Sequence, residues 1–339
     1  WAFATPEALR GGIVVAPKYN GFRFVVEKDT RGRVLMFTEE VFNRATPLQN
    51  YARLLPDVAA ELERLPGPFV LDTEFLAFDG DAPRPRRELA EFRGTEPVND
   101  DGVRLFAFRA LYLPDAGNVT QQPEVENRVA VEAFLNGRKT EHLAVAPHRL
   151  VHAEAELREA VRWAAAQPGS EGAMLKLAHA TYSLGGENDA WAKLKLAREV
   201  RAIVYDRHPV KDSPGVYNFF GAIGPVPRDE ADRWRETIEV GGRLYAPVGK
   251  TFNARLEAKV GDVIRVEVTE LLVDRGGGKQ SVSWFTPVVI DVTDQPPMAP
   301  DEVIRLAQPE EFRKLLAEAL AKRIPVLKTG EERYVLGIV

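Results

Sequence analysis

The sequence has 339 residues, of which 45% are hydrophobic and 28% charged, with a formal net charge of −5 and no cysteine. This composition predicts a soluble globular chain of two domains, and the missing cysteines exclude disulfides, thiolate catalysis and cysteine-bound zinc. The acidic balance is not typical of a nucleic-acid binder, although net charge says little about local patches. The absence of cysteine also predicts a cytoplasmic setting. No apolar run approaches the length of a membrane span and no signal peptide is recognisable, so no membrane span is expected.

The first part of the chain mixes strands and helices, as its hydrophobic periodicity and turn residues indicate. Strands are expected at residues 12–15, 22–27, 69–78, 103–113, 170–177 and 191–196. Helices are expected at residues 46–65, 124–135 and 153–166. Residues 82–101 and 178–188 are polar and predict irregular segments. This pattern predicts an α+β domain with antiparallel sheets over residues 1–198.

The pattern changes near residue 198, where short strands and glycine-rich turns follow one another. Five strands, at residues 202–206, 216–223, 243–248, 262–272 and 281–292, predict a small Greek-key barrel over residues 199–295. Residues 300–323 form a charged amphipathic pattern that predicts a helix. The last segment, 296–339, is therefore expected to be a helical extension, with residues 332–339 as an added edge strand.

A lysine in a tight turn is the first candidate for chemistry. Residues 18–23 read Lys-Tyr-Asn-Gly-Phe-Arg between two predicted strands. Amine side chains can act as nucleophiles that form covalent intermediates, although a lone lysine in a turn is more typical of a solvated loop. Gly21 would let the backbone approach a nucleotide closely.

Carboxylates and further lysines lie on later strands. Asp72 and Glu74 are two residues apart, so they share one strand face, and Glu171 begins another strand. Divalent cations such as Mg²⁺ take one or two carboxylates and leave the other positions to phosphate and water. Lys193 and Lys195 share a face of an otherwise apolar strand, where such a pair would attract phosphate.

Phe106 and Phe108 share a face of the strand at 103–113. Aromatic residues in a strand are more often core than a platform for a base. Trp191 is expected to pack. The whole set is typical of nucleotidyl transfer, which needs a nucleophile, a metal site, a base platform and positive charge at a phosphate.

The order of these motifs resembles that of the ATP-dependent DNA ligases, within the covalent nucleotidyltransferases, over residues 11–292. The matches are residues 18–23 to Lys-x-Asp-Gly-x-Arg, 71–75 to Leu-Asp-Gly-Glu-Leu, 103–113 to the aromatic strand, 171–176 to Glu-Gly-x-Met-x-Lys and 191–195 to Trp-x-Lys-x-Lys. Residues 216–221 and 248–252 are similar to the barrel of bacterial DNA ligases. The resemblance implies an ATP-grasp-like ligase domain, an OB-fold barrel and a helical tail.

The resemblance also implies an activity and a set of site residues. Lys18 would attack the α-phosphorus of ATP, AMP would pass from lysyl-AMP to the 5′-phosphate of nicked duplex DNA, and the 3′-hydroxyl would displace it. The resemblance implies that Arg23 contacts the ribose or the 5′-phosphate region, and that Glu74 and Glu171 serve the ribose and hold Mg²⁺ or Mn²⁺. Phe108 would stack on adenine, Lys176 would bind the nucleotide, and Lys193 and Lys195 would neutralise the α-phosphate. A monomer serving DNA repair, replication or recombination in a prokaryotic or viral setting is implied.

Several positions depart from the family pattern. Ala16 stands where the family has a glutamate that reads the adenine amino group, Asn20 replaces an aspartate, and Arg109 replaces an acidic residue. Residues 291–295 lack the closing Arg-x-Asp-Lys. These departures leave two alternatives open. One is an RNA ligase acting on RNA-containing ends, or a related nucleotidyltransferase with another substrate. The other is a non-catalytic ligase-like module that binds nicked or duplex DNA, or a partner. The retained charged residues favour the enzyme.

Overall fold

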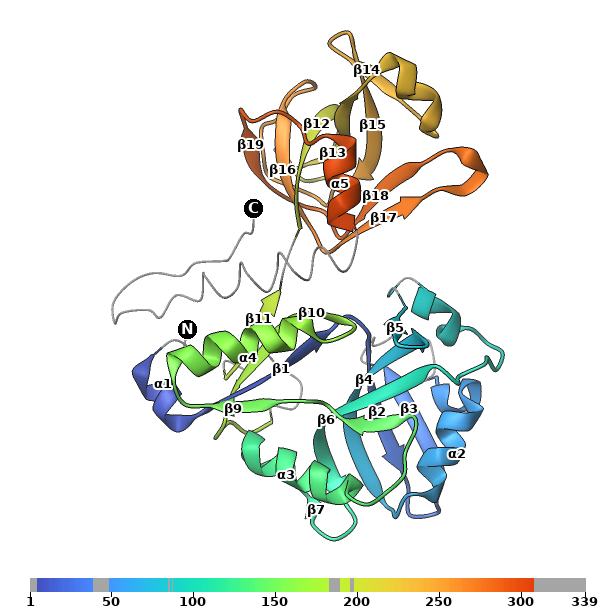
Figure 1. Ribbon diagram of the computed structural model, residues 1–339, viewed down its shortest axis with the longest axis vertical. Coiled ribbons are helices and arrows are strands. Elements are labelled where there is room, and N and C mark those ends of the chain that lie inside the picture. The colour runs from blue at the N-terminus through green and yellow to red at the C-terminus, as the bar shows by residue number, and fades with distance from the viewer. Residues whose placement is uncertain are drawn as a thin grey trace. The chain divides into compact units, whose positions relative to one another are not determined.

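The computed structural model describes residues 5–38, 49–84, 86, 88–182, 190–195 and 198–307. These residues divide into two compact units, one ending at Lys195 and the other beginning at Arg198 (Figure 1). Within the described residues, no helix combines the length and the apolar character that crossing a membrane requires. Both units are built mainly from antiparallel sheets.

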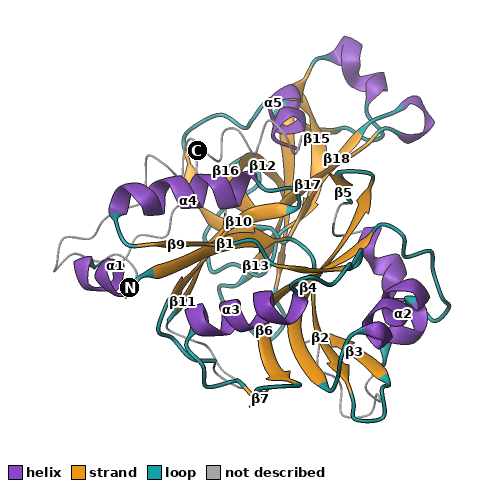
Figure 2. Cartoon of the chain, turned by 60° about the horizontal axis from the view of Figure 1, so that its bottom comes forward, coloured by secondary structure: helices purple, strands orange, loops and turns teal. Residues whose placement is uncertain are grey.

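The first sheet of the N-terminal unit has the strand order β11-β10-β1-β9 and is antiparallel throughout. Its strands are β1 (Ile13–Tyr19), β9 (Arg149–Val151), β10 (Ser170–Leu177) and β11 (Trp191–Lys195), and helix α1 (Pro6–Gly11) precedes β1. Helix α4 (Glu154–Ala166) packs along β1 and β10 (Figure 2). The helix buries one apolar face, formed by Leu157, Ala160, Val161, Ala164 and Ala165.

The second sheet of this unit has the order β3-β2-β4-β6-β7. Its strands are β2 (Phe22–Lys28), β3 (Val34–Thr38), β4 (Phe69–Asp79), β6 (Val103–Leu113) and β7 (Gly117–Asn118), with β5 (Ala82–Pro83) on β4 and β8 (Leu143–Val145) parallel to β6. The remaining elements are α2 (Pro56–Arg64), α3 (Glu124–Leu135), η1 (Tyr51–Leu54) and η2 (Glu88–Arg93). One core contains Phe24, Phe75 and Leu105 from the strands and Leu62 and Val131 from the helices.

The C-terminal unit contains a six-stranded antiparallel sheet of order β14-β15-β13-β12-β16-β19 and a two-stranded sheet, β17–β18. The strands are β12 (Arg198–Pro209), β13 (Tyr217–Val226), β14 (Ile238–Val240), β15 (Arg243–Lys250), β16 (Val263–Val268), β17 (Glu270–Asp274), β18 (Ser281–Phe285) and β19 (Val288–Thr293). The 3₁₀ turn η3 (Arg228–Arg233) lies between β13 and β14, and η4 (Gly276–Gly278) lies between β17 and β18. Helix α5 (Pro300–Ala307) packs on β13 and β17. This unit has its own core around Phe219, Ile264 and Trp284.

The structure corrects three predicted elements. Within the described residues 49–65, the predicted helix at 46–65 is a 3₁₀ turn followed by α2, because Leu55 leaves the helical region at φ −125° and Pro56 begins the helix. Residues 46–48 of this prediction lie outside the described residues. The predicted strand at 262–272 ends at Val268, and the predicted strand at 281–292 is interrupted at Thr286, whose φ is +50°. The hairpin β17–β18 therefore leaves the larger sheet. Residues 308–323 and 332–339, predicted as helix and strand, lie outside the described residues.

Candidate active site

Strand register aligns predicted site residues on one face of the second sheet. Glu74 of β4 lies opposite Arg23 of β2 on one side and Phe106 of β6 on the other. The neighbouring row, Thr73 with its partner Phe24, points into the core. Side chains alternate between the two faces of a strand. Because Thr73 and Phe24 face the core, Glu74 and Arg23 lie on the opposite face of the sheet.

The first sheet presents a second row of predicted residues. Ala16 of β1 lies opposite Met174 of β10, which lies opposite Lys193 of β11. In the next row of the same face, Lys176 lies opposite Trp191. The other face, with Val15 and Ala173, is buried on the side where α4 packs. No carboxylate stands at Ala16, so this row offers no side-chain acceptor for an adenine amino group.

Lys18 lies at an irregularity between β1 and β10. Pro17 pairs with Ala173 and Tyr19 with Ser170, so two residues of β10 stand opposite the single residue Lys18. One of these two residues is Glu171, and its carboxylate accepts a hydrogen bond from the Lys18 ammonium in an ion pair. The predicted nucleophile and a predicted metal ligand are therefore in direct contact, although they are far apart in the sequence.

The turn after Lys18 is held by the second predicted carboxylate. The backbone N–H of Gly21 donates a hydrogen bond of 3.0 Å to Oε1 of Glu74. A Cβ at Gly21 would lie 2.0 Å from the carbonyl oxygen of Phe75. The glycine is thus required by the close approach of the turn to β4. The sequence predicts that Gly21 allows close approach of the backbone to a nucleotide, whereas in the structure the glycine is required by close approach to Phe75 of the protein itself.

Burial raises the pKa of Glu74 to about 7, and the charge of Lys18 and the hydrogen bond from Gly21 only partly oppose this effect. The folded chain therefore keeps the Glu74 proton to a higher pH than the unfolded chain does. Between pH 4.5 and 7 the folded state binds more protons, so raising the pH favours unfolding.

We expect the unfolding free energy of the wild-type chain, relative to Glu74→Gln, to fall by up to about 3 kcal/mol across that interval. Urea denaturation of both chains at several pH values between 4.5 and 7 measures the difference. A difference that stays constant over this interval would contradict the assignment of a raised pKa to Glu74.

Arg23 is held by a buried carboxylate. Its Nε donates to Oδ1 of Asp72 at 2.7 Å, and its Nη2 donates to Oδ2 of the same residue. The Asp72 side chain is 0% exposed, whereas that of Arg23 is 31% exposed. Asp72 therefore neutralises Arg23 from below and leaves part of the guanidinium accessible.

The buried Lys176 lies against the half-buried rings of Phe108 and Trp191. The Lys176 ammonium is 5.0 Å from the ring centroid of Phe108 and 3.7 Å from that of Trp191. It also donates to Glu124 of α3 at 3.1 Å. Burial lowers the pKa of Lys176 to about 8, with Glu124 opposing the shift. In this structure the Phe108 ring therefore contacts the lysine, and Trp191 packs as expected.

The same carboxylate binds two buried arginines. Glu124 accepts hydrogen bonds from Arg109 Nη1 at 2.8 Å and from Arg128 Nε at 2.9 Å. Burial alone would raise the pKa of Glu124, but the charges of Lys176, Arg128 and Arg109 outweigh it and lower the pKa to about 2. Arg109, one of the residues that depart from the family pattern, is thus neutralised by a helix residue that no sequence motif indicates.

The remaining predicted residues are Lys193, Lys195 and Phe106. Lys193 is exposed on β11, and Lys195 belongs to the same strand, opposite Gly172. Phe106 stacks on Tyr19 with ring centroids 4.6 Å apart. Within the described ranges, His, Asp and Glu side chains form no group of three or more that could hold a metal. A cation here would need oxygens from a nucleotide in addition to Glu74 and Glu171.

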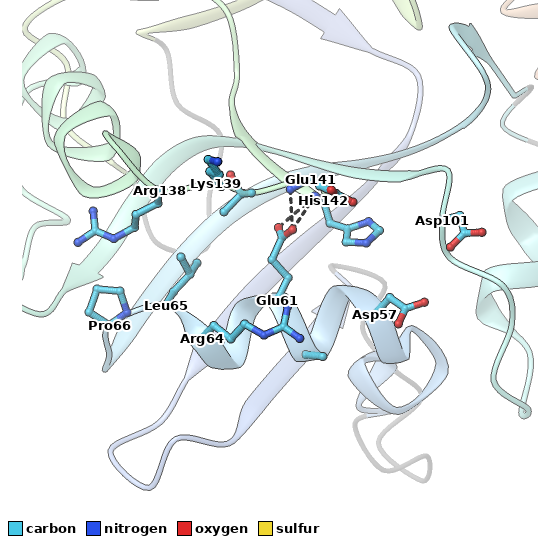
Figure 3. Close-up of a pocket in the computed structure, with 12 residues that line it drawn as sticks. Asp57, Glu61, Arg64, Leu65, Pro66, Asp101, Arg138, Lys139, Glu141 and His142 are labelled. Carbon is cyan, nitrogen blue, oxygen red and sulfur yellow. Dashed lines mark hydrogen bonds between the residues drawn. The ribbon is translucent and has the colours of Figure 1, made fainter.

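A separate cavity of about 720 Å³ lies between α2 and the segment before β8 (Figure 3). The Glu61 carboxylate beside it accepts hydrogen bonds from the backbone N–H groups of Glu141, His142 and Leu143. The cavity is lined by Asp57, Ala60, Glu61, Arg64, Leu65, Pro66, Asp101, Arg138, Lys139, Thr140, Glu141 and His142. None of the predicted site residues lines it, and Glu61 serves to fix the loop to α2.

Comparison with known proteins identifies the family. A family model described as the ATP dependent DNA ligase domain matches residues 5–195. The chain belongs to this family. The matched region contains all the candidate site residues, from Lys18 to Lys195, so the geometry above is that of a DNA ligase family domain.

Two curated relatives are similar to more than half of the chain. A DNA ligase from Natronomonas pharaonis is 31% identical over 193 residues, which cover 55% of this chain and 32% of the relative. A probable DNA ligase from Opitutus terrae is 27% identical over 227 residues, which cover 58% of this chain and 21% of the relative. The match therefore spans about a third and about a fifth of those relatives' lengths.

Solved ligase structures share the fold. The structure called Pmar-Lig_PreS3 has a TM-score of 0.57 at 14% identity, covering 84% of this chain and 64% of its own. A structure from a study of Lig E DNA ligases, described as binding DNA with a minimal scaffold, has a TM-score of 0.50 at 16% identity, covering 81% of this chain and 92% of its own. These similarities support the α+β fold with antiparallel sheets.

Proposed function

We propose that this chain is an ATP-dependent DNA ligase that carries AMP on Lys18 and seals nicks in duplex DNA. The observation that supports the proposal most strongly is the position of Lys18. It lies at the irregularity between β1 and β10, in contact with Glu171 and next to the turn held by Glu74. Membership of the ligase family supports the interpretation of Lys18 as the residue that carries AMP.

In the first step the unprotonated amine of Lys18 attacks the α-phosphorus of ATP. A phosphorus–nitrogen bond forms, the bond between the α-phosphorus and the bridging oxygen breaks, and pyrophosphate leaves. Glu171 accepts a hydrogen bond from Lys18, so it is the side chain placed to take the lysine proton. The main contribution of the protein is then positioning and charge neutralisation, as expected for phosphoryl-type transfer.

In the second and third steps AMP moves from Lys18 to a DNA end and is then released. A 5′-phosphate oxygen attacks the phosphorus of lysyl-AMP and frees the lysine amine. The 3′-hydroxyl at the nick then loses its proton and its oxygen attacks the adenylylated 5′-phosphate. The phosphodiester bond forms, the phosphoanhydride bond to AMP breaks, and AMP leaves. Arg23, Lys193 and Lys195 carry positive charge in or beside the two rows of site residues, as binding of nucleotide and DNA phosphates requires.

The remaining residues have proposed supporting roles. Glu74 and Glu171 would hold a divalent cation, which would neutralise phosphate charge once nucleotide oxygens complete its ligands. Phe108 and Lys176 would contact the base, which requires the lysine to share the Phe108 ring with adenine. The C-terminal unit would act as the OB-type barrel domain that follows the catalytic domain.

Covalent labelling tests the proposal. The protein is incubated with α-labelled ATP and Mg²⁺, denatured, and examined for label on the chain, with α-labelled GTP and adenylate-labelled NAD in parallel because Ala16 cannot read the adenine amino group. Label from ATP that then passes to nicked duplex DNA is the expected result. A chain that takes no label from any of the three nucleotides, and does not seal a pre-adenylylated nick, would overturn the proposal.

A further inference from the structure

Tyr182 connects two charged residues of the candidate site. Its hydroxyl accepts a hydrogen bond of 2.6 Å from Nη2 of Arg23 and donates one of 3.0 Å to Oδ2 of Asp72. Arg23 and Asp72 are also joined directly, at 2.7 Å between Nε and Oδ1. The three side chains therefore form a closed ring of hydrogen bonds. Tyr182 follows β10 and precedes β11, so the ring ties this segment to strands β2 and β4 of the other sheet.

The aromatic ring of Tyr182 is held independently of its hydroxyl. The Arg109 guanidinium lies 5.6 Å from the ring centroid, and the Trp191 ring meets it edge-on at 6.0 Å. Burial, followed by the negative charge of Asp72, raises the pKa of Tyr182 to about 12. The hydroxyl thus keeps its proton at neutral pH and can donate to Asp72 while it accepts from Arg23.

The Tyr182 hydroxyl restricts a rotation of the Arg23 guanidinium that the ion pair with Asp72 still permits. A carboxylate that binds Nε and Nη2 of an arginine permits the guanidinium plane to swing about that edge. A second acceptor at Nη2 restricts this movement, because hydrogen bonds to charged groups are strong and directional. Since the Arg23 side chain is 31% exposed, its orientation decides where its accessible N–H groups point.

We propose that Tyr182 is a positioning residue for adenylylation, with its hydroxyl orienting Arg23 toward the bound nucleotide. The inference rests on the proposed function and goes beyond it by assigning a role to a residue outside the recognised motifs. Tyr182 itself need not touch ATP. It acts through Arg23 and together with Asp72.

The first test replaces Tyr182 by phenylalanine, which keeps the ring and its contacts with Arg109 and Trp191. Single-turnover labelling by ATP is expected to show an increase of about tenfold in KM, with a smaller change in the limiting rate, because a charge-assisted hydrogen bond is lost. Tyr112→Phe is the matched control, since Tyr112 is exposed on β6 of the same unit. The melting temperatures of both variants are measured to separate misplacement of Arg23 from unfolding.

A double-mutant cycle then tests whether Tyr182 acts through Arg23. Arg23→Lys keeps the charge beside Asp72 but loses the planar fork that the hydroxyl fixes. Each single variant should lower the ratio of the limiting labelling rate to KM by a certain factor. We expect the factor for the Tyr182→Phe, Arg23→Lys double variant to be well below the product of the two single factors. Losses that multiply would overturn the proposal, because they would mean that Tyr182 acts independently of Arg23.

Asp72→Asn provides a second route to the same conclusion, since it keeps the shape of the side chain and removes the charge. This variant should also raise KM, and its effect should be non-additive with that of Tyr182→Phe.

The outcomes distinguish the proposed function from the proposed role of Tyr182. A wild-type chain that takes no label and seals no nick overturns the proposed function. A wild-type chain that is labelled, with a Tyr182→Phe variant of unchanged KM, overturns only the role of Tyr182.

Discussion

Replacement of Lys18 by alanine is expected to abolish covalent labelling by α-labelled ATP, a loss of at least about 10³-fold. The physical reason is that the lysine amine forms the bond to phosphorus, and methyl has no lone pair to do so. Glu171 loses its ion pair with Lys18 in this variant, but its side chain is partly exposed, 16% accessible, so the chain should remain folded. Gel autoradiography of the denatured protein measures the covalent label, and a thermal melt of the same preparation measures whether the chain is folded.

Two further variants make this result specific. Lys139→Ala removes an exposed lysine from the same unit and should keep full labelling. Glu171→Gln keeps the size of the side chain but removes its charge, and should slow labelling without eliminating the nucleophile. The assignment of Lys18 would fail if Lys18→Ala were labelled as fast as the wild-type chain, since another residue would then carry AMP.

Elements with strong local signals were predictable from the sequence. The predicted bounds of β6, β10 and α3 agree with the structure, because alternation or helical spacing is bordered there by glycine, proline or charged residues. The shared face of Asp72 and Glu74 also followed from strand periodicity alone. The contact of Lys18 with Glu171, in contrast, depends on the irregular pairing of β1 and β10, which no local pattern encodes.

Residues that act through distant partners could not be found in this way. Tyr182 is 159 positions from Arg23, and it lies in a polar segment with no periodic pattern to mark it as buried. Glu124 looked like an ordinary first-turn residue of a helix, where acidic side chains are common. Its role depends on three cations brought to it by β6, β10 and its own helix. The one available signal was Arg109, a charged residue inside an otherwise apolar strand.

Removal of the Glu124 charge is expected to cause the largest loss of stability. The Glu124→Gln variant should lower the unfolding free energy by about 3–5 kcal/mol, because it leaves Arg109, Arg128 and Lys176 buried without a counter-charge. Urea denaturation near neutral pH measures the change. Glu132→Gln on the same helix is the matched control. Its side chain is 53% exposed, so its effect should stay within about 0.5 kcal/mol.

The pH dependence gives the same prediction a second, independent readout. The pKa of Glu124 is lowered from 4.5 to about 2, so its stabilising contribution is complete above pH 4.5 and is lost as the pH falls toward 2. The difference in unfolding free energy between the wild-type chain and Glu124→Gln should therefore narrow below pH 4.5. A difference below about 1 kcal/mol at neutral pH, or one that does not narrow on acidification, would contradict this account.

The same argument explains why Arg109 can replace an acidic residue of the family pattern. Burial of a guanidinium without a counter-charge would cost several kcal/mol. Arg109 is tolerated because Glu124 neutralises its charge and the backbone carbonyl oxygens of Thr120 and Gln122 accept further hydrogen bonds from it. Arg109→Met in the Glu124→Gln background should consequently recover part of the lost stability, whereas Arg109→Met alone should remove a favourable pairing. This reversal of sign would show that the two positions act as a unit, and that a departure in one motif is balanced by a residue outside every motif.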